Sequence, residues 1–100
     1  MKKQKNKNIN YKKRQENEKK FPGFNESPDG SRTYWFELKG KLGWKARYVK
    51  IVDTYETTLS FRQEIYDEND NLVEIHEKYP IDKGHIKIKD DDNNKTATRN

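Results

Sequence analysis

The sequence predicts a mainly β protein, a curved and half-barrel-like antiparallel meander of five strands between two disordered tails. Three observations support this fold class. Nearly all apolar residues lie between Tyr34 and Ile88, they alternate with polar residues at a period of two, and short polar turns separate the alternating runs. Because only 29% of the chain is hydrophobic and 39% is charged, the core must be small. We therefore predict a basic tail over residues 1–20, a single β domain over 21–90 and a polar tail over 91–100.

The N-terminal tail carries the excess positive charge of the chain. Residues 1–20 hold nine Lys or Arg and two Glu, whereas the remaining 80 residues have a net charge of −2. A segment this rich in Lys, Asn and Gln is typical of disorder, with residues 11–20 able to form a transient helix on a surface. The tail either binds RNA or DNA phosphates without sequence specificity or only keeps the protein in solution.

The predicted domain starts with an irregular segment and continues as five strands. Residues 21–32 contain Pro, Gly, Asn and Ser, so we expect a lead-in whose Phe21 and Phe24 pack on the edge of the sheet. The five strands that follow are expected at residues 33–39, 44–52, 57–66, 72–79 and 85–89. One face of this sheet is apolar and the other is charged. The apolar face is closed by curvature of the sheet, by the Phe21 segment or by a second subunit, so a homodimer is one of the expectations.

Composition excludes several classes of function. The chain has no cysteine, which removes disulfides, thiolate metal sites and cysteine nucleophiles. It also has no apolar run of about 18 residues, so no membrane span is expected, and we predict a cytoplasmic protein. Residues 67–78 resemble a calcium loop only at their start, because Leu72 and Lys78 occupy the positions of the required Gly and Glu. We predict no metal site and no cofactor.

The two histidines of the chain flank a turn, and this is the feature that points to a site. His76 and His85 lie on either side of Pro80, Asp82 and Gly84, so a hairpin would place the two imidazoles opposite each other. Side chains that titrate near neutrality suit acid–base chemistry. The same pattern also occurs in a solvated hairpin that has no function.

Extending the predicted register across the sheet places the histidines in a basic row. We expect the row Arg47–Arg62–His76–His85 on the charged face, beside a second row, Lys45–Glu64–Glu74–Lys87. Directly opposed side chains in a sheet are close enough to interact. Four basic groups side by side repel one another unless an anion lies over them, whereas the second row pairs opposite charges at its ends.

The basic row predicts a phosphate site with two alternatives for its use. In the catalytic hypothesis, His76 and His85 act as base and acid in metal-independent RNA cleavage, and Arg47, Arg62 and Lys87 bind phosphate. Tyr66 and Tyr79 are the candidates for stacking on a base. In the alternative, these residues are ordinary components of a polar sheet face.

The segment Tyr79-Pro80 followed by Asp82-Lys83-Gly84-His85-Ile86-Lys87 resembles a Gly-His-basic segment in small prokaryotic toxins of the TumE kind. The resemblance covers about a dozen residues and implies a toxin that acts on RNA or nucleotides, paired with a cognate antitoxin. It assigns Asp82, Gly84, His85 and Lys87 as site positions. A small prokaryotic family without this activity fits the same residues.

The prediction of function is therefore a small basic RNA-interacting protein, with ribonuclease activity as one form of it. The alternative is a non-catalytic module that binds protein or nucleic acid.

Overall fold

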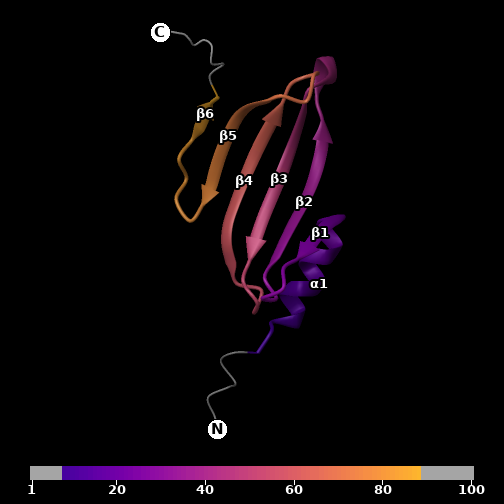
Figure 1. The fold of residues 1–100 in the computed structure, drawn as a ribbon, viewed down its shortest axis with the longest axis vertical. Coiled ribbons are helices and arrows are strands. Elements are labelled where there is room, and N and C mark those ends of the chain that lie inside the picture. The colour runs from indigo at the N-terminus through magenta and orange to yellow at the C-terminus, as the bar shows by residue number, and fades with distance from the viewer. Residues whose placement is uncertain (1–7, 89–100) are drawn as a thin grey trace.

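The strands are joined in chain order into a single open antiparallel sheet with one helix beside it (Figure 1). We describe residues 8–88 of a computed structural model. The elements are α1 (Tyr11–Lys20), β1 (Gly23–Glu26), β2 (Arg32–Lys39), a short 3₁₀ turn (Lys41–Gly43), β3 (Lys45–Val52), β4 (Thr58–Tyr66), β5 (Leu72–Tyr79) and β6 (His85–Lys87). The mainly β antiparallel meander is confirmed, with β1 as a sixth strand inside the segment predicted to be an irregular lead-in.

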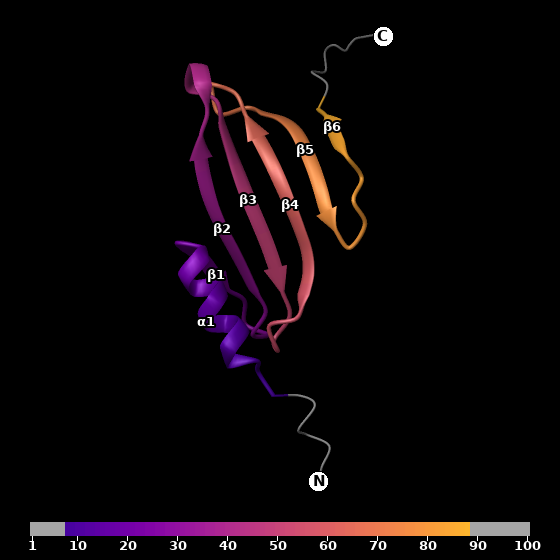
Figure 2. The same cartoon turned by 180° about the vertical axis from the view of Figure 1, so that it is seen from behind.

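Helix α1 corrects the prediction of a disordered segment over residues 11–20. Asn10 caps it, because its side-chain oxygen accepts from the amide of Lys13 at 3.1 Å. Lys19 and Lys20 occupy the last turn, where positive charge favours the helix dipole. The helix lies beside β1 at the end of the sheet where β1 and β2 join (Figures 1 and 2). Residues 1–7 of the predicted N-terminal tail and the predicted tail 91–100 lie outside the described residues.

Three of the hairpin loops share one construction. In loops 27–31, 53–57 and 67–71 the amide of the first residue donates to the carbonyl of the fifth at 2.9 Å. The fourth residue has a left-handed backbone, with φ of 91° at Gly30, 76° at Glu56 and 64° at Asp70. This geometry is a type I turn followed by a left-handed residue, and it matches the twist of the flanking strands.

The register of β5 and β6 is the one the sequence predicts. His76 lies opposite His85, and Glu74 lies opposite Lys87. The registers of the two preceding hairpins differ from prediction, because irregularities shift the pairing between Ile51 and Val52 and at two places along β4.

These shifts remove the predicted basic row. Arg47 lies opposite Glu64 rather than Arg62, and Arg62 lies opposite Glu77 rather than His76. The residue opposite His76 is Gln63, which neighbours Arg62 in the chain. Because successive side chains of a strand point to opposite faces, the arginines and the histidines lie on different faces of the sheet.

We call the face toward α1 the helix face and the other the open face. The helix face carries Tyr34, Phe36, Tyr48, Lys50 and Phe61, and the open face carries Trp35, Arg47, Val49, Arg62 and Tyr66.

The core lies under the segment that follows α1. Phe21, Tyr34 and Val52 form the buried cluster, and Phe36 and Phe61 pack against it. The ring centroid of Phe21 is 5.8 Å from that of Tyr34 and 5.4 Å from that of Phe36. The Phe21 segment therefore covers one end of the apolar face, as one of the sequence alternatives proposes.

Candidate functional site

The two histidines are in direct contact and belong to a chain of four polar groups. His76 Nδ1 lies 3.1 Å from His85 Nε2. The other nitrogen of His76 lies 2.6 Å from Asp82 Oδ1, and the other nitrogen of His85 lies 2.5 Å from Glu74 Oε2. The amide of Gly84 and, after it, His76 lower the pKa of Asp82 below its usual range.

The hydrogen bonds among these four groups limit the acid–base chemistry open to the two histidines. Each carboxylate contact requires a proton on the facing ring nitrogen, and the contact between the rings requires one more. Three protons on the four ring nitrogens would satisfy every contact at once. All four ring nitrogens are then occupied, and none is left to act on a substrate. These hydrogen-bonded side chains connect β6 to β5.

The predicted arginine clamps are already paired on the open face. Arg47 donates to Glu37 Oε2 at 2.9 and 2.6 Å, and Arg62 donates to Glu64 Oε2 at 2.6 Å. Tyr66, predicted to stack on a base, donates to the other oxygen of Glu64 at 2.7 Å. These carboxylates neutralise the groups expected to bind phosphate.

Lys87, the third predicted phosphate ligand, is exposed on β6 opposite Glu74. Within residues 8–88, no group of three or more metal-binding side chains is placed to hold a metal ion.

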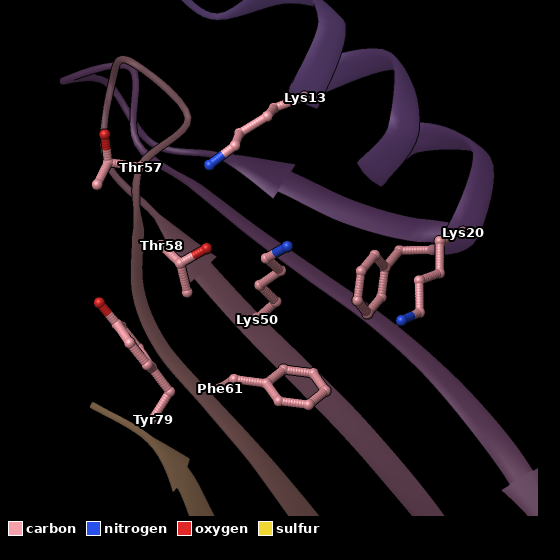
Figure 3. Close-up of a pocket in the computed structure, with 8 residues that line it drawn as sticks. Lys13, Lys20, Lys50, Thr57, Thr58, Phe61 and Tyr79 are labelled. Atoms are coloured by element: carbon pink, nitrogen blue, oxygen red, sulfur yellow. The ribbon is translucent and has the colours of Figure 1, made fainter. Parts of the chain in front are cut away.

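A different basic site lies between α1 and the helix face. It is a pocket of about 410 Å³. Its lining consists of Lys13, Lys20, Phe21, Lys50, Thr57, Thr58, Phe61 and Tyr79 (Figure 3). Three ammonium groups, three hydroxyls and three aromatic rings thus share one cavity, and no carboxylate of residues 8–88 is among its lining. Tyr79 is the only lining residue that the sequence analysis assigned to a site.

Lys50 supplies the charge on the sheet side of this pocket. Its Nζ donates to Asn17 Oδ1 at 2.9 Å and lies 6.0 Å from the centroid of the Phe21 ring. Burial lowers the pKa of Lys50, and the positive charges of Lys20 and Lys13 lower it further. The carboxylates of Glu56 and Glu16 act in the opposite direction and offset part of this lowering. Within the described residues, none of the three lysines forms an ion pair with a carboxylate, so their mutual repulsion is only partly compensated.

Glu56 holds the helix wall of the pocket in place. Its side chain is 1% exposed and accepts hydrogen bonds from the Tyr34 hydroxyl, from Asn17 Nδ2 at 3.2 Å and from Arg14 Nε at 3.0 Å. Burial opposes the charge of Glu56, but the three donors outweigh burial and keep its pKa below the usual range. The amide of Asn10 adds a bond to the Tyr55 carbonyl at 3.2 Å. A loop between β3 and β4 therefore positions α1.

Sequence reasoning missed this pocket because α1 was expected to be disordered. One signal was present: in the second predicted strand, residues 44–52, Lys50 follows Ala46 and Tyr48 at a spacing of two. A lysine that continues an apolar series of a strand indicates a charge placed among apolar side chains.

Comparison with known proteins gives no match: no family model, curated protein or solved structure matches the chain. The similarity to TumE-like toxins stays a prediction. Within residues 8–88, no helix has the length and apolar character that a membrane crossing requires.

Proposed function

We propose that this protein is a small RNA-binding module whose binding surface is the pocket between α1 and the helix face. The observation that carries the proposal is the convergence of Lys13, Lys20 and Lys50 on a cavity without a carboxylate in its lining. Lysines that share a cavity without an ion-pair partner favour an anionic ligand, and phosphate is the anion that a polynucleotide supplies.

The aromatic walls favour a nucleotide over a bare anion. Proteins that bind single strands combine a basic groove with exposed rings on which bases stack. Tyr79 is half exposed at the pocket, and Lys78 lies over the Tyr48 ring at 5.7 Å on the same face. A single strand leaving the pocket would continue past Tyr79 and Lys78 along β5.

Binding of a fluorescent single-stranded RNA, followed by anisotropy, tests the proposal. Lys50→Met removes the charge and keeps the side-chain stem, and Lys41→Met is the matched control at an exposed position away from the pocket. We expect about tenfold weaker binding for Lys50→Met, the effect of losing one charge-assisted contact. We also expect a smaller dependence of its affinity on salt. Equal affinities of the two variants would contradict the proposal.

The prediction of ribonuclease activity has less support than the proposal of RNA binding. Every nitrogen of His76 and His85 has a partner in the chain described above, and Arg47 and Arg62 lie on the other face. Incubation of RNA with the protein in EDTA, beside a His76→Ala/His85→Ala variant, tests this prediction. RNA cleavage by the wild-type protein that the variant lacks would support ribonuclease activity.

A further inference from the structure

We infer that the pocket recognises a phosphorylated end of a nucleic-acid strand, a phosphomonoester, in preference to an internal phosphodiester. This inference rests on the proposed function and specifies its ligand. The argument concerns charge, then the hydroxyl donors, then the aromatic wall.

The charge of the pocket suits a dianion. Among the residues that the structure describes, Lys13, Lys20 and Lys50 line the cavity and no carboxylate does. An internal phosphodiester carries one negative charge, whereas a phosphomonoester carries about 1.5 to 2 at pH 7. The second charge of the monoester therefore gains most where several ammonium groups converge.

Lys20 and Lys50 each place an ammonium group beside the Phe21 ring in the absence of a ligand. Their Nζ atoms lie 5.7 and 6.0 Å from the centroid of the same Phe21 ring. Lys50 is also held by Asn17, which belongs to α1. Because the Lys50 ammonium group is positioned in advance by this hydrogen bond, a ligand has less side-chain entropy to remove at Lys50.

Thr57 and Thr58 line the pocket at the start of β4, and the Thr58 hydroxyl adds a neutral donor. Figure 3 shows Lys13 extending from α1 toward the sheet and the Thr58 hydroxyl facing Lys50. A terminal phosphate has three non-bridging oxygens to place among these groups, and an internal phosphate has two.

Tyr79 provides a surface for the base of the terminal nucleotide. It lies opposite Phe61 in the register of β4 and β5, and both line the pocket. Within residues 8–88, Tyr79 has no aromatic partner and its side chain is 47% exposed. One face of its ring is thus available for stacking, which is worth about 1–3 kcal/mol per base in single-strand binding proteins.

The test compares one RNA sequence with a 5′-phosphate, a 3′-phosphate or hydroxyls at both ends, bound to the full chain. We expect a phosphorylated form to bind at least about tenfold more tightly at pH 7.5. The preference should shrink at pH 5.5, below the second phosphate pKa of about 6. Lys50→Met should remove the preference and Lys41→Met should keep it. Adenosine monophosphate and inorganic phosphate should compete with the phosphorylated strand.

The possible results separate the inference from the proposed function. Equal binding of the three strands would overturn the inference and leave RNA binding in place. Binding of adenosine monophosphate that depends on Lys50, without binding of any strand, would overturn RNA binding and support a phosphomonoester pocket. Absence of binding in every arm would overturn both. A preference retained by Lys50→Met would place phosphate recognition outside this pocket and overturn the inference.

Discussion

Replacing Glu56 by alanine should remove the attachment of α1 and destabilise the protein. The substitution leaves the Arg14 guanidinium, whose side chain is 15% exposed, and the buried Asn17 and Tyr34 without their acceptor. Removing one partner of a buried ion pair costs about 3–5 kcal/mol. For a domain of this size, a loss of 3 kcal/mol corresponds to a Tm lower by roughly 12–24 °C.

Urea unfolding measures this loss directly. Circular dichroism follows the sheet and helix together, and amide exchange of residues 11–20 reports on α1 alone. We expect Glu56→Ala to lower the free energy of unfolding, with the largest increase in exchange in α1. A free energy within about 1 kcal/mol of wild type, with unchanged exchange in α1, would refute the anchoring role.

A glycine at the same position separates the anchor from the backbone. Glu56 has φ of 76°, and a left-handed conformation costs a residue other than glycine about 1–2 kcal/mol. Glu56→Gly should therefore be about 1 kcal/mol more stable than Glu56→Ala while still less stable than wild type. If glycine restores full stability, the loss in the alanine variant comes from the backbone and not from the carboxylate.

Three further outcomes follow from the described contacts. Asp70→Gly, at an exposed left-handed position that forms an ion pair with Lys45, should leave stability unchanged or raise it by up to about 1 kcal/mol; a loss above 1 kcal/mol in urea unfolding would contradict this. Because the folded pKa of Glu56 is lowered, its contribution is complete above the unfolded pKa of about 4.3 and is lost as pH falls through the folded pKa. Glu56→Gln should therefore show a shallower loss of stability below about pH 4.3, and an unchanged acid profile would count against it. Long-range ¹H–¹⁵N spectra near neutral pH should find a protonated Nε2 on His76 and a protonated Nδ1 on His85. If His85 instead carries its proton on Nε2 and none on Nδ1, the hydrogen bond from His85 to Glu74 is excluded.

The sheet was predictable from sequence because its signal is local. Alternation over short runs and polar turns define each strand, and the Pro80–Gly84 turn was sufficient to predict that His76 faces His85. Bulges are not visible in such a pattern. One extra residue of β4 opposite Ile51 and Val52 and two extra residues along β5 shift the pairing, and a shift of one residue moves a side chain to the other face.

The candidate site was harder to predict because its helix wall is polar. Most surface helices reveal themselves by an apolar stripe, but α1 buries Asn17 and attaches through Arg14 and Glu56. The partners of Glu56 lie 22 to 42 residues away in the chain. No local periodicity records such contacts, so the lysines of α1 were assigned to a tail and no role was predicted for Lys50.

Because the Glu56 carboxylate attaches α1 to the sheet, the pocket depends on a contact that the sheet itself does not need. Lys13 and Lys20 belong to α1, so the cavity exists only while the helix is attached. The repulsion of these two lysines by Lys50 opposes the attraction of Arg14 for Glu56. Salt screens exposed charges more than buried ones. Moderate ionic strength should thus favour the arrangement in which α1 is attached to the sheet, even as it weakens the attraction of the pocket for an anion. A bound phosphate stabilises the same arrangement by mass action, so the occupancy of the pocket and the docking of α1 are thermodynamically linked.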